Sequence, residues 1–214
     1  MESQNPSHRN PIQWIYSSRN NQELAERYDH WAKDYDTDLE QDFEWVAPQK
    51  AAEVFAKYVP KSGRVLDAGA GTGLVGKFLS ESGYSNLVAM DLSMGMLEEA
   101  RKKKVYQEFH QMVMGETLGF SADYFDAVVS VGVLTVGHAP ASSLDELIRV
   151  TRPGGYVIFS LRPDVYESDG FKEKQADLES AGKWELTEES EQFQPLPKGE
   201  PEVYHQVWVY RVCQ

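Results

Sequence analysis

The chain has 214 residues and a mass of 24.3 kDa, which predicts a single domain with an elaboration. Its 34 acidic residues against 21 basic ones give a net charge of −13, so we expect no nucleic-acid partner. The single cysteine, Cys213, excludes an intramolecular disulfide and a cysteine-based zinc site. The first ten residues are polar, and no stretch is apolar enough for a membrane span. We therefore expect a cytoplasmic protein that does not bind a membrane.

The first sixty residues predict a tail followed by helices. Residues 1–20 are polar and are expected to form a tail. Apolar residues recur at steps of three to four over 21–34, which predicts a helix. These residues are Leu24, Tyr28, Trp31 and, just beyond, Tyr35. A second helix is expected over about 48–58, because it begins with a proline. Residues 21–60 are therefore predicted to form a helical lid over a core domain at 61–214.

From residue 61 onward, short apolar strands alternate with helical segments. We expect strands at 64–68, 86–91, 109–113, 125–131 and 156–161, and helices at 74–79, 94–104, 142–150 and beyond 171. The segments around 184–186 and 203–212 are expected to form an antiparallel pair. This alternation predicts a doubly wound α/β fold, with a mostly parallel sheet covered by helices on both faces.

The most informative stretch is VLDAGAGTG at 65–73, where a strand runs into three alternate glycines and then into a helix. Glycine lets the backbone approach a ligand and adopt positive φ, and the helix N-terminus offers free N–H groups. A dinucleotide site would have the spacing G-x-G-x-x-G, whereas this loop has G-x-G-x-G. A triphosphate-binding loop would need Ser or Thr after Lys77, where Phe78 stands.

An S-adenosylmethionine site needs neither phosphate nor metal, and its cationic methionyl end favours an acid such as Asp67 beside the glycines. Asp91 ends the next strand, at the edge of the sheet where open α/β proteins bind ligands, and can accept both ribose hydroxyls. Taken separately, the glycines could form a turn without a ligand, and Asp91 could cap the helix after Ser93. The two features together favour an S-adenosylmethionine site.

Four motifs, VLDAGAGTG, AMDLSMGML, FDAVVS and RPGGYVIFS, resemble those of class I S-adenosylmethionine-dependent methyltransferases over about residues 61–162. The segments YDHWAKDYD, SVGVLTVGHAP and FKEKQADLESAGKWE further resemble the Williams–Beuren syndrome-region methyltransferase-like proteins. The resemblance implies a Rossmann-like sheet of seven strands, the last one antiparallel. It also implies S-adenosylmethionine as the cofactor and S-adenosylhomocysteine as the product.

The resemblance also implies a set of cofactor-binding residues in the core domain. They are Asp67, Ala68, Gly69, Gly71, Gly73, Asp91, Leu92, Met96, Met114, Gly115, Glu116 and Ser130. The glycines would wrap the methionyl part, and Asp67 would orient its ammonium through the loop. Asp91 would hold the ribose, with Leu92 and Met96 against the adenine. Met114 stands where many relatives have an adenine-binding acid, so backbone groups would have to replace that contact.

Three aromatic residues on one helical face, Tyr28, Trp31 and Tyr35, would cover the cofactor and place rings near its sulfonium. The alternative is an amphipathic helix that buries its aromatic residues. His138, after the fourth strand, is the candidate general base, although a structural role is the alternative. Arg162 could pair with a substrate carboxylate or be a surface charge. The remaining histidines lack metal-ligand spacing, so no metal is expected.

These features predict a methyltransferase of class EC 2.1.1 that methylates a small molecule, acting as a monomer or homodimer. A protein or peptide methyltransferase is the alternative, since a basic peptide would suit the acidic surface. Two further alternatives are a cofactor-binding module without catalysis and a dinucleotide oxidoreductase, for which the glycine spacing is wrong.

Overall fold

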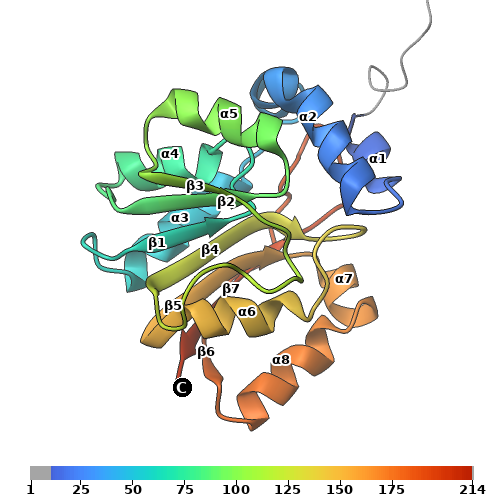
Figure 1. Cartoon of the computed structure of the whole chain (residues 1–214). Helices are drawn as coiled ribbons and strands as arrows, with labels where there is room; N and C mark the ends of the chain where they lie inside the picture. The colour runs from blue at the N-terminus through green and yellow to red at the C-terminus, as the bar shows by residue number, and fades with distance from the viewer. Residues whose placement is uncertain (1–10, 214) are drawn as a thin grey trace, which may run out of the picture.

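The computed structural model describes residues 11–213. Its central sheet has seven strands (Figure 1). The strands are β1 Val65–Ala68, β2 Leu87–Asp91, β3 Glu108–Gln111, β4 Phe125–Leu134, β5 Thr151–Leu161, β6 Trp184–Glu189 and β7 Gln206–Val212. The helices are α1 Pro11–Tyr16, α2 Asn21–Thr37, the π-helix η2 Asp38–Asp42, α3 Ala47–Tyr58, α4 Leu74–Glu81, α5 Met94–Lys103, α6 Ser143–Val150, α7 Pro163–Ser168 and α8 Phe171–Ser180.

The strand order is β3-β2-β1-β4-β5-β7-β6. All pairs from β3 to β5 are parallel, whereas β7 runs antiparallel to both β5 and β6. This confirms the predicted Rossmann-like sheet with its antiparallel last strand, and the predicted late pair. The order reverses between β1 and β4, so the carboxyl ends of these two strands form the switch point where open α/β sheets bind ligands.

Helices cover both faces of the sheet, as the doubly wound fold requires. Strands β1 and β2 are buried along their whole length, as is typical of parallel strands covered on both faces. One core cluster joins the sheet to α6 and α8, and the other joins it to α3, α4 and α5. Helix α3 therefore packs in the core, although it falls within the segment predicted as a lid.

The segment Pro153–Gly155 lies inside β5 as an irregularity. Phe125 pairs with Thr151, whereas Ala127 pairs with Tyr156, so β5 has extra residues at this point. Helix α7 has no counterpart among the predicted elements. Ser93 caps α5, because its hydroxyl accepts the Met96 N–H at 3.0 Å.

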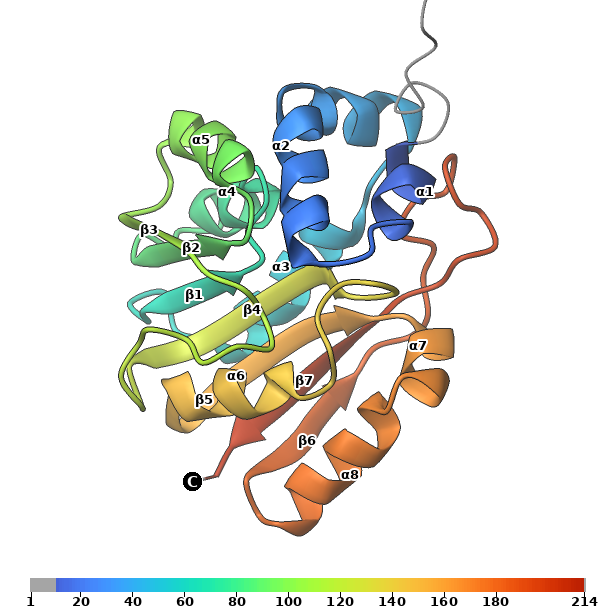
Figure 2. The ribbon, with the colours of Figure 1, turned by 45° about the vertical axis from the view of Figure 1, so that its right-hand side comes forward.

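A third hydrophobic cluster joins α1, α2 and η2, which we call the N-terminal helical unit, to the segment between β6 and β7. Its buried members are Ile12, Ile15, Leu24, Trp31, Leu39 and Leu196. Figure 2 shows the unit beside the carboxyl end of β4. Helix α1 lies inside the segment predicted as a polar tail, because Ile12 and Ile15 find a cluster to enter. The rest of that predicted tail, residues 1–10, lies outside the described residues.

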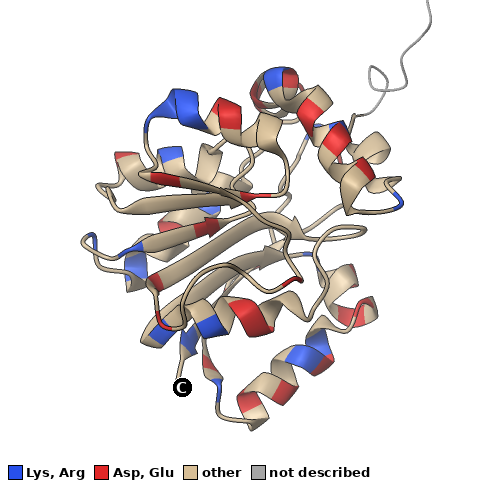
Figure 3. Cartoon of the chain, viewed as in Figure 1, with Lys and Arg blue, Asp and Glu red and all other residues tan. Residues whose placement is uncertain are grey.

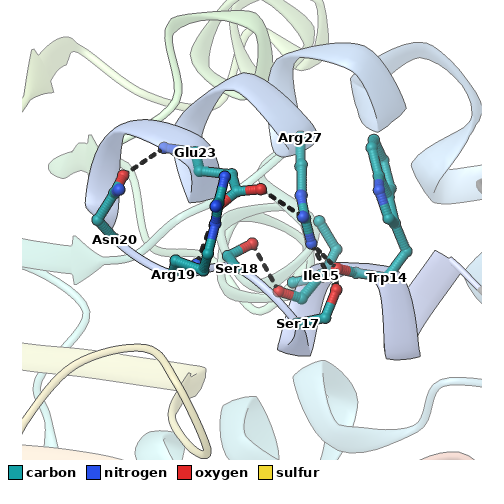
Figure 4. A network of polar contacts seen from close by, with 8 residues as sticks. All are labelled: Trp14, Ile15, Ser17, Ser18, Arg19, Asn20, Glu23 and Arg27. Carbon is teal, nitrogen blue, oxygen red and sulfur yellow. Dashed lines mark hydrogen bonds and ion pairs between the residues drawn. The ribbon is translucent and has the colours of Figure 1, made fainter.

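The turn between α1 and α2 is held by a polar network (Figure 4). Asn20 caps α2 by accepting the Glu23 N–H at 2.9 Å. The Arg27 guanidinium donates to the Trp14 carbonyl and, at 2.7 Å, to the Ser17 hydroxyl. It also pairs with Glu23 at 2.5 Å. One side chain of α2 therefore holds the last turn of α1 in place.

Charge is unevenly distributed over this fold. Acidic side chains recur along α2, whereas the last turn of α5 is basic (Figure 3). In residues 11–213, no helix combines the length and the apolar character needed to cross a bilayer.

Candidate active site

The glycine loop between β1 and α4 adopts the left-handed backbone conformation that its glycines predict. Gly69, Gly71 and Gly73 have φ values of +81°, +54° and +90°. A Cβ at Gly69 would lie 2.2 Å from Val133 Cγ2, so this position excludes any side chain. A Cβ at Gly71 would meet nothing within 4 Å, because it would project into a cavity. The loop thus brings bare backbone to the edge of that cavity.

Asp91, at the end of β2, is tied to this loop by its carboxylate. Oδ2 accepts the Gly71 N–H at 2.8 Å, and Oδ1 accepts the Ser93 N–H at 2.9 Å. Burial raises the pKa of Asp91 to about 6, although both of these bonds oppose the shift. Each carboxylate oxygen has two lone pairs, so the side chain can still accept hydroxyl donors from the cavity.

Asp67, at the end of β1, is enclosed behind the loop. Its Oδ2 accepts the Tyr106 hydroxyl at 2.5 Å, and that hydroxyl accepts the Gly76 N–H at 3.1 Å. Its Oδ1 is buried and has no partner among residues 11–213. Burial raises the pKa of Asp67 to about 7, whereas the bond from Tyr106 lowers it. Asp67 is therefore linked through Tyr106 to the first turn of α4, directly after the loop.

Helix α2 is fixed over the site by two carboxylates. The first, Asp29 Oδ1, accepts the Ser93 hydroxyl at 2.5 Å and the Gly95 N–H at 2.7 Å. The second, Asp36, accepts the Thr72 hydroxyl and pairs with Lys103 at 2.5 Å. These contacts bring the N-terminal helical unit against the glycine loop and the start of α5.

Tyr28 of α2 and His138, in the loop after β4, form a second link across the site. The Tyr28 hydroxyl lies 2.8 Å from His138 Nε2, and His138 Nδ1 lies 2.9 Å from the Val136 carbonyl oxygen. A carbonyl only accepts, so Nδ1 carries the proton and Nε2 accepts from Tyr28. Burial lowers the pKa of His138, which keeps the ring neutral at pH 7.

The cavity beneath α2 encloses about 790 Å³, its open mouth included, and lies at the switch point. Nine of the predicted site residues line it: Tyr28, Tyr35, Gly69, Gly71, Asp91, Leu92, Met96, Met114 and His138. Side chains from α2, the glycine loop and the ends of β2 and β4 thus face one space. A cofactor in this cavity would reach Asp91 and the loop together.

Six predicted residues are not part of that lining: Asp67, Ala68, Gly73, Gly115, Glu116 and Ser130. The Ser130 hydroxyl donates to the Ala68 carbonyl at 2.8 Å and joins β4 to β1. Gly73 is the N-terminal cap of α4, and Gly115 passes close beneath Pro140. Direct contact with the cofactor remains a prediction for these six residues.

Several residues that the sequence did not single out also line the cavity. Thr72 belongs to the glycine motif itself, and Met112 and Val113 directly precede Met114, so proximity in sequence could have indicated all three. Trp45 follows η2, and no sequence signal marks it, because only the turn of the chain before α3 brings it to the site.

A second cavity of about 540 Å³ adjoins the first and shares Tyr28, Tyr35, Trp45, Gly132 and His138 with it. Its other walls come from α1, α2, η2, the loop after β4 and the segment between β6 and β7. They are Ile12, Ile15, Tyr16, Trp31, Leu39, Thr135, Pro195, Leu196, Glu200 and His205. Trp31, predicted beside the cofactor, faces this second cavity and donates to Asp38 at 2.6 Å.

The first cavity fits S-adenosylmethionine in shape and chemistry. Bare backbone at Gly71 leaves room that a side chain would fill, and Asp91 supplies acceptors for hydroxyl groups. The walls formed by Leu92, Met96 and Met114 are apolar, as an adenine ring requires. Among the described residues, no three His, Cys, Asp or Glu side chains come together as a metal site.

Known proteins share both the fold and the sequence of this site. A family model described as a methyltransferase domain matches residues 66–159. The fold and site thus define a class I S-adenosylmethionine-dependent methyltransferase, and the chain belongs to that family, whose cofactor is S-adenosylmethionine.

Among individual proteins, human methyltransferase-like protein 27 is 37% identical over 168 residues, which cover 74% of this chain and 66% of that relative. A demethylmenaquinone methyltransferase from Clavibacter sepedonicus is 41% identical over 98 residues, which cover 44% of this chain and 39% of the relative. The chain therefore spans between about four tenths and two thirds of the length of these relatives.

The fold is also found in a solved complex between the Haloferax volcanii Trm112 methyltransferase activator and a methyltransferase. One chain of that complex superposes with a TM-score of 0.66 and 17% identity, over 87% of this chain and 98% of that chain. This likeness shows the shared architecture.

Proposed function

We propose that the protein transfers the methyl group of S-adenosylmethionine to a small-molecule acceptor and releases S-adenosylhomocysteine. The observation that carries the proposal is the junction of the two cavities at Tyr28, Tyr35 and His138. A transfer between two bound molecules needs two adjoining spaces, and each of these is the size of a small ligand. A relative named for demethylmenaquinone supports a small acceptor.

In this proposal the first cavity holds the cofactor, with the glycine loop at its methionyl part and Asp91 at its ribose. S-adenosylmethionine supplies an activated methyl group, so the protein mainly has to position the two reactants. His138 is neutral and lies at the junction, where Nε2 can take up the acceptor's proton through the Tyr28 hydroxyl, which would donate its own proton to Nε2 as it receives the acceptor's. Tyr28 and Tyr35 would face the sulfonium with their rings.

The test is calorimetric titration with S-adenosylhomocysteine, with NADH and ATP–Mg²⁺ as controls. We expect micromolar or tighter binding, about −8 kcal/mol, for S-adenosylhomocysteine alone. Absence of that binding, or tighter binding of either control, would contradict the proposal.

A further inference from the structure

The second cavity combines aromatic walls with two unpartnered polar atoms. Oε2 of Glu200 and Nδ1 of His205 are both buried, and neither finds a hydrogen-bond partner in the part of the chain that the structure describes. Both residues line this cavity and not the first one. A buried polar atom without a partner is energetically unfavourable, and a ligand that pairs with it removes that cost.

His205 is held firmly at this place. Its backbone N–H and C=O pair with those of Phe193, both at 2.9 Å, directly before β7. The side chain is only 7% exposed. Burial lowers the pKa of His205 to about 4, and the nearby Arg162 acts in the same direction. At neutral pH the ring is uncharged, so one of its nitrogens can accept a donor from the cavity.

Glu200 provides the charge of this wall. Its Oε1 accepts the Gln13 side-chain amide of α1 at 3.0 Å, which orients the carboxylate and leaves Oε2 without a partner. Arg162, whose charge acts on His205, is held by Asp164 through two bonds of 2.9 and 2.6 Å. Because this cation is paired while Glu200 Oε2 has no partner among the described residues, the polar wall of the cavity favours a cation over an anion.

The opposite walls suit a flat, apolar body. Tyr16, Tyr28, Trp31 and Trp45 face the cavity, and aromatic faces attract both rings and cations. Tyr28 and Trp31 stack with their rings nearly parallel, at a centroid distance of 6.5 Å. Tyr28 also lies at the junction with the first cavity, so the aromatic walls lead from the polar end toward the cofactor.

Building on the proposed function, we propose that the acceptor is a small aromatic amine that binds in the second cavity. Its protonated amino group donates to Glu200 Oε2 and His205, and its ring packs against the aromatic walls. The atom that is methylated lies at the other end of the molecule, beside His138. There the bond between sulfur and methyl breaks and a bond to the acceptor atom forms. The proton of that atom passes to His138 Nε2, and the sulfonium becomes a neutral thioether.

Three probes with one ring system test this inference: tyramine, 3-(4-hydroxyphenyl)propionate and 4-ethylphenol. Their heads are cationic, anionic and apolar. Each is titrated by calorimetry into the protein saturated with S-adenosylhomocysteine. We expect tyramine to bind at least tenfold more tightly than the other two. Equal affinity for all three, preference for the propionate, or no binding of any probe would overturn the inference.

Two variants assign the preference to the proposed groups. Glu200→Gln keeps the oxygen that accepts from Gln13, and we expect it to weaken tyramine at least tenfold while 4-ethylphenol is unchanged. Glu202→Gln, an exposed neighbour, serves as the matched control and should change neither affinity. His205→Phe removes the ring nitrogens at similar volume and should weaken tyramine in the same way. If Glu200→Gln does not fold, His205→Phe alone tests the proposed amine site.

Different outcomes contradict the proposed function and the proposed amine site. Loss of S-adenosylhomocysteine binding in the unmodified protein would contradict the proposed function. Intact S-adenosylhomocysteine binding without a preference for tyramine would contradict the amine site alone. A tyramine preference that survives in Glu200→Gln would also overturn the assignment to Glu200.

Discussion

The hydroxyl of Tyr28 lies 2.8 Å from Nε2 of His138, although 110 residues separate them in the chain. The contact joins α2 to the loop after β4 at the point where the two cavities meet. The Val136 carbonyl fixes the tautomer of His138, because Nδ1 donates to it, so Nε2 accepts from the Tyr28 hydroxyl. The donor to the candidate base therefore belongs to the helical unit that covers the first cavity.

Tyr28→Phe should separate positioning of the base from cofactor binding. The phenyl ring keeps its contacts in the cavity while His138 loses the hydroxyl that orients it. We expect methyl transfer to fall at least tenfold and the S-adenosylhomocysteine Kd to stay within about threefold. Steady-state kinetics and calorimetry measure the two effects. Tyr124→Phe, at an exposed position, is the control, and unchanged turnover in Tyr28→Phe would contradict the role.

Gly71→Ala should weaken cofactor binding. The same substitution at Gly170 tests whether backbone strain alone explains the loss. Gly71 and Gly170 both have positive φ and open space where a Cβ would point, but only Gly71 faces the first cavity. Alanine should cost each site about 1–2 kcal/mol of stability through backbone strain. Only Gly71→Ala should weaken S-adenosylhomocysteine, by at least tenfold in calorimetry. An equal effect of Gly170→Ala would mean that strain, and not the cavity, explains the loss.

Asp91→Asn should weaken the cofactor while preserving the shape of the side chain. The amide can accept at one oxygen only, so it cannot serve the Gly71 and Ser93 N–H groups and the ribose together. We expect a loss of about 1–3 kcal/mol in S-adenosylhomocysteine affinity. Asp177→Asn, at an exposed position of α8, should have no effect. Unchanged affinity for S-adenosylhomocysteine in a folded Asp91→Asn variant would contradict the placement of the ribose at Asp91.

Asp67→Asn should change how stability depends on pH. The pKa of Asp67 is about 7 in the folded protein, above its ordinary value of 3.8. The stability that protonated Asp67 contributes is therefore fully present below about pH 4 and is lost as the pH rises through about 7. The Tm advantage of Asp67→Asn over the unmodified protein should be several degrees larger at pH 8 than at pH 5. Thermal unfolding at both values tests this, and a constant difference would contradict it.

Much of the fold follows from the sequence because local patterns agree with the tertiary structure in the core domain. Buried parallel strands read as short apolar runs, and positive φ at Gly69, Gly71 and Gly73 demands glycine. The carboxyl ends of neighbouring parallel strands lie at one edge of a doubly wound sheet, so the sequence alone predicts that Asp91 lies beside the glycine loop. A binding site formed by such short motifs can therefore be predicted from the sequence.

Only the tertiary structure decided which side chains share each cavity. Helix α1 forms because the apolar groups of Ile12 and Ile15 enter a cluster supplied by α2 and the segment before β7, which no local pattern reveals. For the same reason Trp31 faces the second cavity, and Asp67 lies enclosed against Tyr106. Glu200 and His205 meet side chains of α1 across long separations in sequence, since packing of the N-terminal helical unit against the segment between β6 and β7 builds that wall. Periodicity and motifs report on neighbours along the chain, whereas the second cavity is made by contacts between segments that lie far apart in the chain.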